Sequence, residues 1–86
     1  MKFSWDPRKH GIAFDEAITV FNDPMAVIFD DMVHSEEEHR EIIIGFSTLS
    51  RLVLVCFVER SEDTIRIISA RRATKAEIKD YEENTG

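Results

Sequence analysis

The chain has 86 residues, of which 43% are hydrophobic and 33% are charged, and its formal net charge is −6. This length predicts one small globular domain over residues 1–86 and excludes a second hydrophobic core. The negative charge argues against a partner as anionic as nucleic acid, unless the charges are unevenly distributed.

Cys56 is the single cysteine of the sequence. No disulfide can form within the chain, so a reducing compartment is expected, and the thiol lies in an apolar run where cysteine behaves as a small hydrophobe. The N-terminus lacks the apolar segment of a signal peptide, and nowhere do about 18 apolar residues run together. These features favour a cytoplasmic protein that makes no contact with a membrane.

The first third of the sequence predicts a strand followed by a helix. Residues 2–5 alternate in polarity, which predicts a short strand, and Asp6-Pro7 ends it. Between Phe14 and Phe21, apolar residues recur at the intervals of one helix face. Asn22-Asp23-Pro24 ends this amphipathic helix.

The middle of the sequence predicts three strands. Residues 25–29 are apolar and predict a strand, whereas residues 30–38 are acidic enough to predict a solvated loop or strand end. Residues 40–47 and 51–60 are two further β-rich runs, joined by residues 48–50 at a length suited to a hairpin. The second of these runs is apolar on both faces, so it belongs in the middle of a sheet.

The last part of the sequence predicts a strand and a capped helix. Residues 61–63 form a short turn into a strand over residues 64–70. Thr74 and Glu77 match the capping-box pattern, with Thr74 as the N-cap, and open a helix that directs Tyr81 inward.

The predicted elements follow the order β-α-β-β-β-β-α. Because turns too short for parallel crossovers join consecutive strands, the sequence predicts an α+β fold with a mostly antiparallel sheet of four to five strands. The two helices are expected to pack on this sheet and to cover one of its faces.

The charges are separated along the sequence. Residues 30–41 carry six acidic side chains and one basic one, whereas residues 51–75 carry six basic side chains and three acidic ones. Arginine binds phosphate and carboxylate groups through two parallel hydrogen bonds, so the basic region is a candidate for an anionic partner. The alternative is structural: Arg60 and Arg66 pair with nearby acidic residues or lie on a solvated sheet face.

The histidines are candidates for acid–base or metal chemistry. His10 follows Arg8-Lys9, and the reference pKa of histidine, about 6.5, suits proton transfer. A hydrogen-bonded structural role is the alternative for His10. His34 and His39 flank three glutamates, but their spacing fits no recognised zinc pattern. A solvated acidic loop is therefore expected, with no metal and no cofactor.

Several motifs, taken in chain order, match the pattern of one known family. The first are Trp5-Asp6-Pro7, Lys9-His10-Gly11-Ile12, Phe14, Glu16-Ala17, Val20-Phe21 and Asp23-Pro24. The later ones are Glu38, Arg40, Ile44-Gly45, Ser47, Arg51-Leu52, Leu54-Val55, Glu59-Arg60, Ile65-Arg66-Ile67-Ile68-Ser69-Ala70-Arg71, Ala73, Glu77 and Tyr81. Together they span nearly the whole chain and resemble the BrnT family of bacterial type II toxins.

The resemblance implies a ribonuclease toxin with a fold like that of the RelE messenger-RNA interferases. It also implies metal-independent cleavage of RNA, which inhibits translation and growth. The implied partner is a BrnA-type antitoxin that carries a DNA-binding domain, neutralises the toxin and represses the shared operon with it. The toxin is then expected to meet DNA only through the antitoxin.

Cleavage of RNA needs a group that takes the ribose 2′-hydroxyl proton, a group that protonates the leaving 5′ oxygen, and cations at the phosphorus. Residue chemistry, laid over the resemblance, gives five catalytic candidates: Lys9, His10, Arg60, Arg66 and Arg71. The candidates for RNA binding are Arg40, Arg51, Arg72 and Tyr81. A structural role is the alternative for Arg40, and Glu77 is assigned to the helix cap.

The resembling family has a longer segment between the motifs at Pro7 and Lys9. Because the shorter segment shifts Lys9 and His10 relative to the sheet, a second function is considered: a binding module with weakened catalysis that serves as antitoxin partner and operon co-repressor. A stand-alone structural domain is a third, and it requires the arginines to be salt-bridge partners only. Expression of the chain alone separates the first two, because only a ribonuclease degrades RNA and arrests growth.

Overall fold

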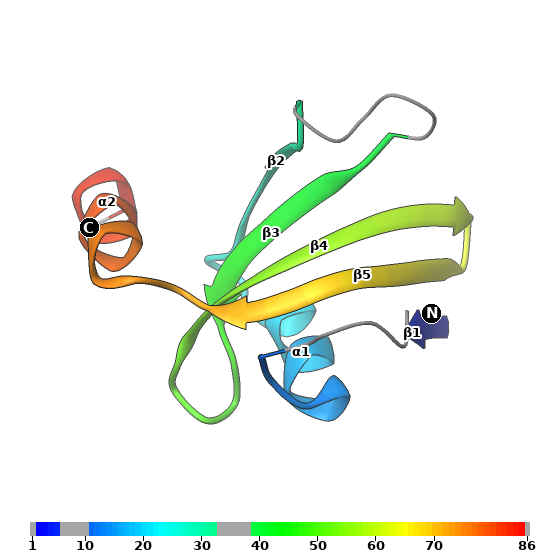
Figure 1. Cartoon of the computed structure of the whole chain (residues 1–86), viewed down its shortest axis with the longest axis horizontal. Coiled ribbons are helices and arrows are strands. Elements are labelled where there is room, and N and C mark those ends of the chain that lie inside the picture. The colour runs from blue at the N-terminus through cyan, green and yellow to red at the C-terminus, as the bar shows by residue number, and fades with distance from the viewer. Residues whose placement is uncertain (1, 6–10, 33–38, 86) are drawn as a thin grey trace.

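The computed structural model describes residues 2–5, 11–32 and 39–85 of the chain. Within these ranges the chain forms five strands, two α-helices and one 3₁₀ turn (Figure 1). They are β1 (Lys2–Trp5), α1 (Phe14–Thr19), the 3₁₀ turn η1 (Val20–Asn22), β2 (Val27–Asp30), β3 (Glu41–Phe46), β4 (Leu52–Ser61), β5 (Thr64–Arg72) and α2 (Lys75–Thr85).

The strands form one sheet in the order β1-β5-β4-β3-β2. The pairs β2–β3, β3–β4 and β4–β5 are antiparallel, whereas β1 runs parallel to β5, with Lys2 opposite Thr64. The α+β class is confirmed, but the sheet is mixed. The short turns between β3, β4 and β5 dictate antiparallel pairing only for the strands that they join. The chain between β1 and β5 contains the other described strands, so this long connection allows the pair to be either parallel or antiparallel.

Strand β4 has a neighbour on each side, as its apolar run predicts. Its side chains alternate between two clusters on opposite faces of the sheet. On the face that α1 covers, here the α1 face, lie Ala17, Val20, Ile43, Val53, Val55, Phe57, Ile65 and Ile67. On the other face, here the α2 face, the cluster consists of Ile44, Leu52 and Tyr81, with Leu54, Ala73 and Ile78 packed against it.

The two helices therefore lie on opposite faces, and the expectation that they share one face is wrong. Figure 1 shows α1 below the sheet and α2 beyond the end of β5, on the far side from α1. The chain leaves β5 at Arg72 and enters α2 after only two residues, Ala73 and Thr74. This short link keeps α2 at the end of the sheet, where it covers Leu52 and Leu54 and leaves much of the α2 face open.

Glu16 fastens α1 to the turn between β3 and β4. Its side chain is buried, and its carboxylate accepts hydrogen bonds from Arg51 Nε at 2.8 Å, from Arg51 Nη2 and from Ser47 Oγ at 2.7 Å. The Arg51 guanidinium holds the pKa of the Glu16 carboxyl below its usual value, against the opposing effect of burial. The helix is thus oriented by a charge pair as well as by its apolar face.

The turn after η1 is fastened to β3 by Asp23. Its Oδ1 accepts a hydrogen bond from Met25 N at 2.9 Å, and its Oδ2 accepts one from Phe46 N at 2.7 Å. The turn lies so close to β3 that a Cβ at Gly45 would stand 2.8 Å from Ala26 Cβ. Glycine is required at position 45 for this reason, and β2 begins two residues later than predicted because Met25 belongs to the turn.

Candidate functional site

A cavity of about 230 Å³ opens on the part of the α2 face that α2 leaves uncovered. Its polar lining includes Arg40, which precedes β3, and Arg71, near the end of β5. Cys56 and Ser69, which face each other across β4 and β5, lie between the two arginines in the sheet. The lining is completed by Asp31, Ile42, Leu54 and Ile68. Two predicted site residues, one from each group of candidates, therefore meet at one cavity.

Arg71 is held at this cavity by α2. Its Nη1 and Nη2 donate to Glu77 Oε1 and Oε2 at 2.7 and 2.8 Å, a two-bond arrangement of guanidinium and carboxylate. Glu77 also belongs to the predicted capping box: its Oε1 accepts from Thr74 N, and its backbone N–H donates to Thr74 Oγ1. The Arg71 guanidinium lowers the pKa of Glu77 to about 2. The cap is confirmed, and its carboxylate orients the arginine as well.

The thiol of Cys56 lies 3.6 Å from Asp31 Oδ2. Burial, assisted by the negative Asp31 carboxylate, raises the pKa of the Cys56 thiol to about 11. The thiol is therefore protonated at neutral pH, donates its hydrogen to the Asp31 carboxylate and is not poised as a nucleophile. Asp31 itself is buried and continues the pairing of β2 with β3, because its N–H donates to the Arg40 carbonyl at 2.9 Å.

The other predicted arginines are divided between the two faces. Arg66 pairs with Val58 and lies between the core residues Ile65 and Ile67, so its side chain stands on the α2 face. Arg60 lies in the bulge at the end of β4. On the opposite face, Arg51 is bound to Glu16, and Arg72, which pairs with Val53, adds positive charge near the same carboxylate.

Tyr81 is buried at the edge of the α2 face. Its ring meets Phe46 edge-on at 5.8 Å between centroids, and its hydroxyl donates to the Met25 carbonyl at 3.0 Å. The predicted inward direction of Tyr81 is confirmed. Lys9 and His10, the candidates for acid–base chemistry, lie outside the described residues.

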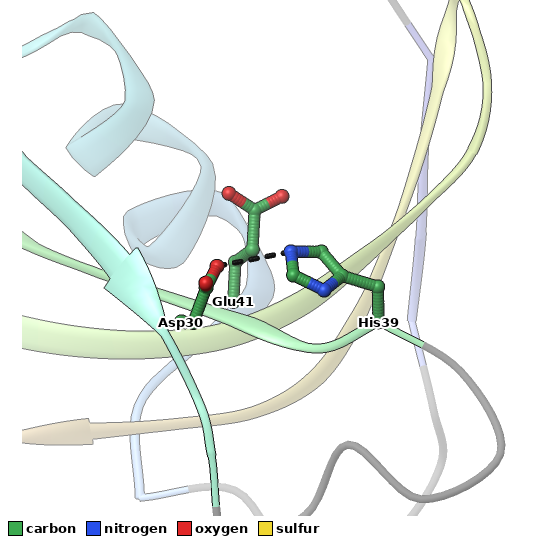
Figure 2. A group of neighbouring side chains, drawn as sticks. All are labelled: Asp30, His39 and Glu41. Carbon is green, nitrogen blue, oxygen red and sulfur yellow. Dashed lines mark ion pairs between the residues drawn. The ribbon is translucent and has the colours of Figure 1, made fainter.

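A second group of polar side chains lies where β2 and β3 pair near their ends, Asp30 opposite Glu41. Figure 2 shows His39 pointing at Asp30, with His39 Nε2 2.9 Å from Asp30 Oδ1. One ligand atom from each of Asp30, His39 and Glu41 falls within 4.8 Å of the others. The His39 and Asp30 side chains are more than half exposed, whereas Asp31 is buried, and residues 33–38, most of the predicted acidic loop, lie outside the described residues.

Sequence reasoning did not place Ser69 or Asp31 at the site, and it treated Cys56 as a hydrophobic residue only. The signal for Ser69 was its position two residues before Arg71 in a strand, which puts both side chains on one face. The sequence did not indicate that Glu77 is the partner of Arg71, for a different reason. The capping box accounts for Glu77 locally, so nothing in the pattern called for a second contact.

No helix within the described residues is both long and apolar enough to span a membrane. A search of curated proteins found no match to the chain. One family model matches residues 2–77, that of the ribonuclease toxin BrnT of the type II toxin–antitoxin system. This span runs from β1 to the first turn of α2 and includes the cavity with Arg40 and Arg71. The chain belongs to the BrnT family of ribonuclease toxins from type II toxin–antitoxin systems.

Proposed function

We propose that this toxin cleaves RNA at the cavity on the α2 face, without a metal ion and in the manner of the RelE toxins. The ribose 2′-oxygen loses its proton and attacks the adjacent phosphorus. The bond from phosphorus to the 5′ oxygen breaks, and that oxygen takes up a proton. The products are a 2′,3′-cyclic phosphate and a free 5′-hydroxyl, so the protein supplies only proton transfer and charge.

The convergence of Arg40 and Arg71 on one cavity supports this proposal. Arg40 lies immediately before β3 and Arg71 lies in β5, and these are the two strands that flank β4. Fixed guanidinium groups at a phosphate stabilise the extra negative charge of the transition state, and they need no rearrangement during the reaction. Glu77 holds the Arg71 guanidinium in one orientation, which is the preorganisation that such a role requires.

The remaining candidates take roles around this pair. Arg66 extends the positive charge along the α2 face, Arg60 is a further proposed catalytic cation from the end of β4, and Lys9 and His10 are the proposed acid and base. Arg51, Arg72 and Tyr81 remain predicted RNA contacts outside the cavity. The net charge of −6 is compatible with RNA because residues 30–41 carry the acidic excess and residues 51–75 carry the basic one.

The protein partner that we propose is a BrnA-type antitoxin with a DNA-binding domain. The toxin contributes no DNA contact of its own in this arrangement, and the complex represses the operon. Because the RNA substrate is in the cytoplasm, we place the toxin there as a single domain over residues 1–86.

Single substitutions at the cavity test the cleavage site. Arg71→Ala and Arg40→Ala should each lower the rate of RNA cleavage by about 100-fold or more, the range for loss of one transition-state donor. Arg71→Lys should recover little, because lysine lacks the planar two-bond geometry. Lys79→Ala is the matched control, since it removes an exposed cation from α2 away from the cavity.

The assay is cleavage of a labelled RNA by purified toxin, with the product ends identified by mass spectrometry. Cyclic phosphate ends and an unchanged rate in EDTA are expected. Full activity in Arg71→Ala and Arg40→Ala would move the site elsewhere, and loss of activity in EDTA would refute the metal-independent mechanism. Arg72→Ala, one residue away but on the α1 face, measures whether RNA contacts extend there.

One observation favours the second function, a binding module with weakened catalysis. The guanidinium of Arg71 is already engaged by a carboxylate at both Nη atoms, so an RNA phosphate must compete with Glu77. Induction of the toxin alone in bacteria separates the two functions. Growth arrest with RNA degradation supports the ribonuclease, whereas normal growth with folded, abundant toxin and intact RNA supports the binding module.

A further inference from the structure

The apolar surface of this protein is concentrated on one edge of the sheet. Among the described residues, five of the seven exposed large hydrophobic side chains lie between residues 25 and 32: Met25, Val27, Ile28, Phe29 and Met32. Three of them, with Asp30, make up β2, and all four residues of this strand are exposed. In Figure 1, β2 stands at the edge of the sheet, beside β3.

Edge strands normally carry protection against pairing with other chains. Lysine, proline, a bulge or burial under a helix is the usual device, because an open edge presents unpaired backbone groups. Strand β2 pairs only with β3 among the described strands and contains no lysine or proline. At the other edge of the sheet, Phe3 and Trp5 of β1 pack against the core instead. The exposed apolar edge is thus specific to β2.

A groove lies beside β2 on each face of the sheet. On the α2 face, Val27 and Phe29 line a largely apolar cavity of about 260 Å³ with Ile44, Leu54 and Tyr81. On the α1 face, Ile28 lines a cavity of about 350 Å³ with Phe3, Phe21, Phe57 and Ile65. Side chains of an added strand alternate between the two faces, so consecutive residues of such a strand would enter one groove and then the other.

The charges around β2 indicate what kind of chain fits there. Asp30 ends the strand, Glu41 lies opposite it, and Asp80 lines the groove on the α2 face, where the Glu77 carboxylate is already paired with Arg71. A second copy of the toxin would bring the same acidic groups against each other, on a chain that already carries a net charge of −6. RNA is disfavoured for the same reason. A strand with basic residues among its apolar ones matches both the grooves and the charge.

We propose that β2 is the docking edge for the antitoxin, which adds to the sheet a strand that carries basic residues among its apolar ones. The inference rests on the membership of the chain in a type II toxin–antitoxin family, not on the location of the RNA site. Backbone hydrogen bonds to β2 give this contact much of its affinity, and the two grooves give it specificity.

Substitutions on β2 test the proposal through binding alone. Ile28→Lys replaces a side chain that is 53% exposed, on the face away from the arginine cavity, with a cation that repels a basic partner. We expect the Kd for the cognate antitoxin, measured by interferometry, to rise at least about tenfold, as for loss of an interface anchor. Leu49→Lys, at a residue 63% exposed in the β3–β4 turn, is the matched control and should leave Kd within about twofold.

Cleavage of RNA by Ile28→Lys in the absence of antitoxin checks that the variant folds, and it keeps this test separate from that of the cleavage site. Hydrogen exchange on the unmodified toxin provides a second measurement. The amides of residues 27–30 should become protected when the antitoxin binds. If β2 stays unprotected in a saturated complex, or if Ile28→Lys binds as tightly as Leu49→Lys, the proposal is wrong. A toxin dimer that Ile28→Lys dissociates, seen by light scattering, would assign the edge to a second copy instead.

Discussion

Gly45 offers a stringent test of how α1 and its following turn are joined to the sheet. A Cβ at this position would lie 2.8 Å from Ala26 Cβ and 2.9 Å from Asp23 Oδ2. Ala26 Cβ cannot move without its backbone, so the whole turn has to shift. We therefore expect Gly45→Ala to unfold more easily than the unmodified chain.

Two effects set the size of the change. Overpacking of a close contact costs about 1–3 kcal/mol. Loss of the 2.7 Å bond from Phe46 N to the Asp23 carboxylate costs about 1.5–3 kcal/mol, since hydrogen bonds to charged groups are the stronger ones. Alanine recovers about 0.5–1 kcal/mol through the lower entropy of its unfolded state. The expected net loss is about 1.5–5.5 kcal/mol, which in a domain of this size lowers Tm by roughly 6–44 °C.

Gly11→Ala is the matched control for this measurement. The nearest heavy atoms to a Cβ there are 3.6 Å away, an ordinary contact distance. It should change the free energy of unfolding by less than about 1 kcal/mol, because only the entropy of the unfolded state differs. The assay is thermal and urea unfolding followed by circular dichroism. Equal Tm values for the two variants would refute the account of the turn as a rigid neighbour of β3.

Two further predictions concern titrating groups. Glu77 has a pKa of about 2 in the folded state and about 4.5 when unfolded, so its contribution is present above pH 4.5 and lost as pH falls toward 2. Urea unfolding measures the free energy of unfolding that is lost as pH falls through this window. Glu77→Gln should lose about 1 kcal/mol less than the unmodified chain, a value that allows for solvent screening of a partly exposed pair. Equal losses in the two proteins would contradict the Arg71–Glu77 pairing. Cys56, with a pKa of about 11, should react with iodoacetamide at pH 8 at least about tenfold more slowly than free cysteine, and Asp31→Asn should speed the reaction; a rate equal to that of free cysteine would show an open thiol.

Local patterns in the sequence predicted most of the elements. The alternation over residues 2–5, the apolar run in β4 and the Thr74–Glu77 cap each depend on residues within one turn or strand, and each is confirmed. Strand ends were less accurate: β5 continues to Arg72 rather than to Ala70 because Val53 of β4 still has a partner there. The end of β5 is set by its pairing with β4, and the local sequence pattern of β5 carries no information about that pairing.

The relations that sequence reasoning missed are those between distant residues. The parallel pairing of Lys2 with Thr64 and the Glu16–Arg51 pair join parts of the chain far apart in sequence. The division of the arginines between the two faces was missed for the same reason. Strand alternation predicts that Arg71 and Arg72 point to opposite faces, but it does not predict which face holds the cavity. The convergence of Arg40 with Arg71 depends on the strand order, which no single motif specifies.

The position of β1 has a consequence for synthesis of the toxin. Its partner β5 follows every other described strand in the sequence, so β1 has no neighbour in the sheet until β5 has been synthesised. Until then Phe3 and Trp5 lack the strand that positions them beside Phe21 and Phe14. A prematurely terminated product would therefore expose these aromatic rings and become a target for proteases instead of an active fragment. The sheet of this toxin therefore closes only after β5, and not strand by strand in the order of synthesis.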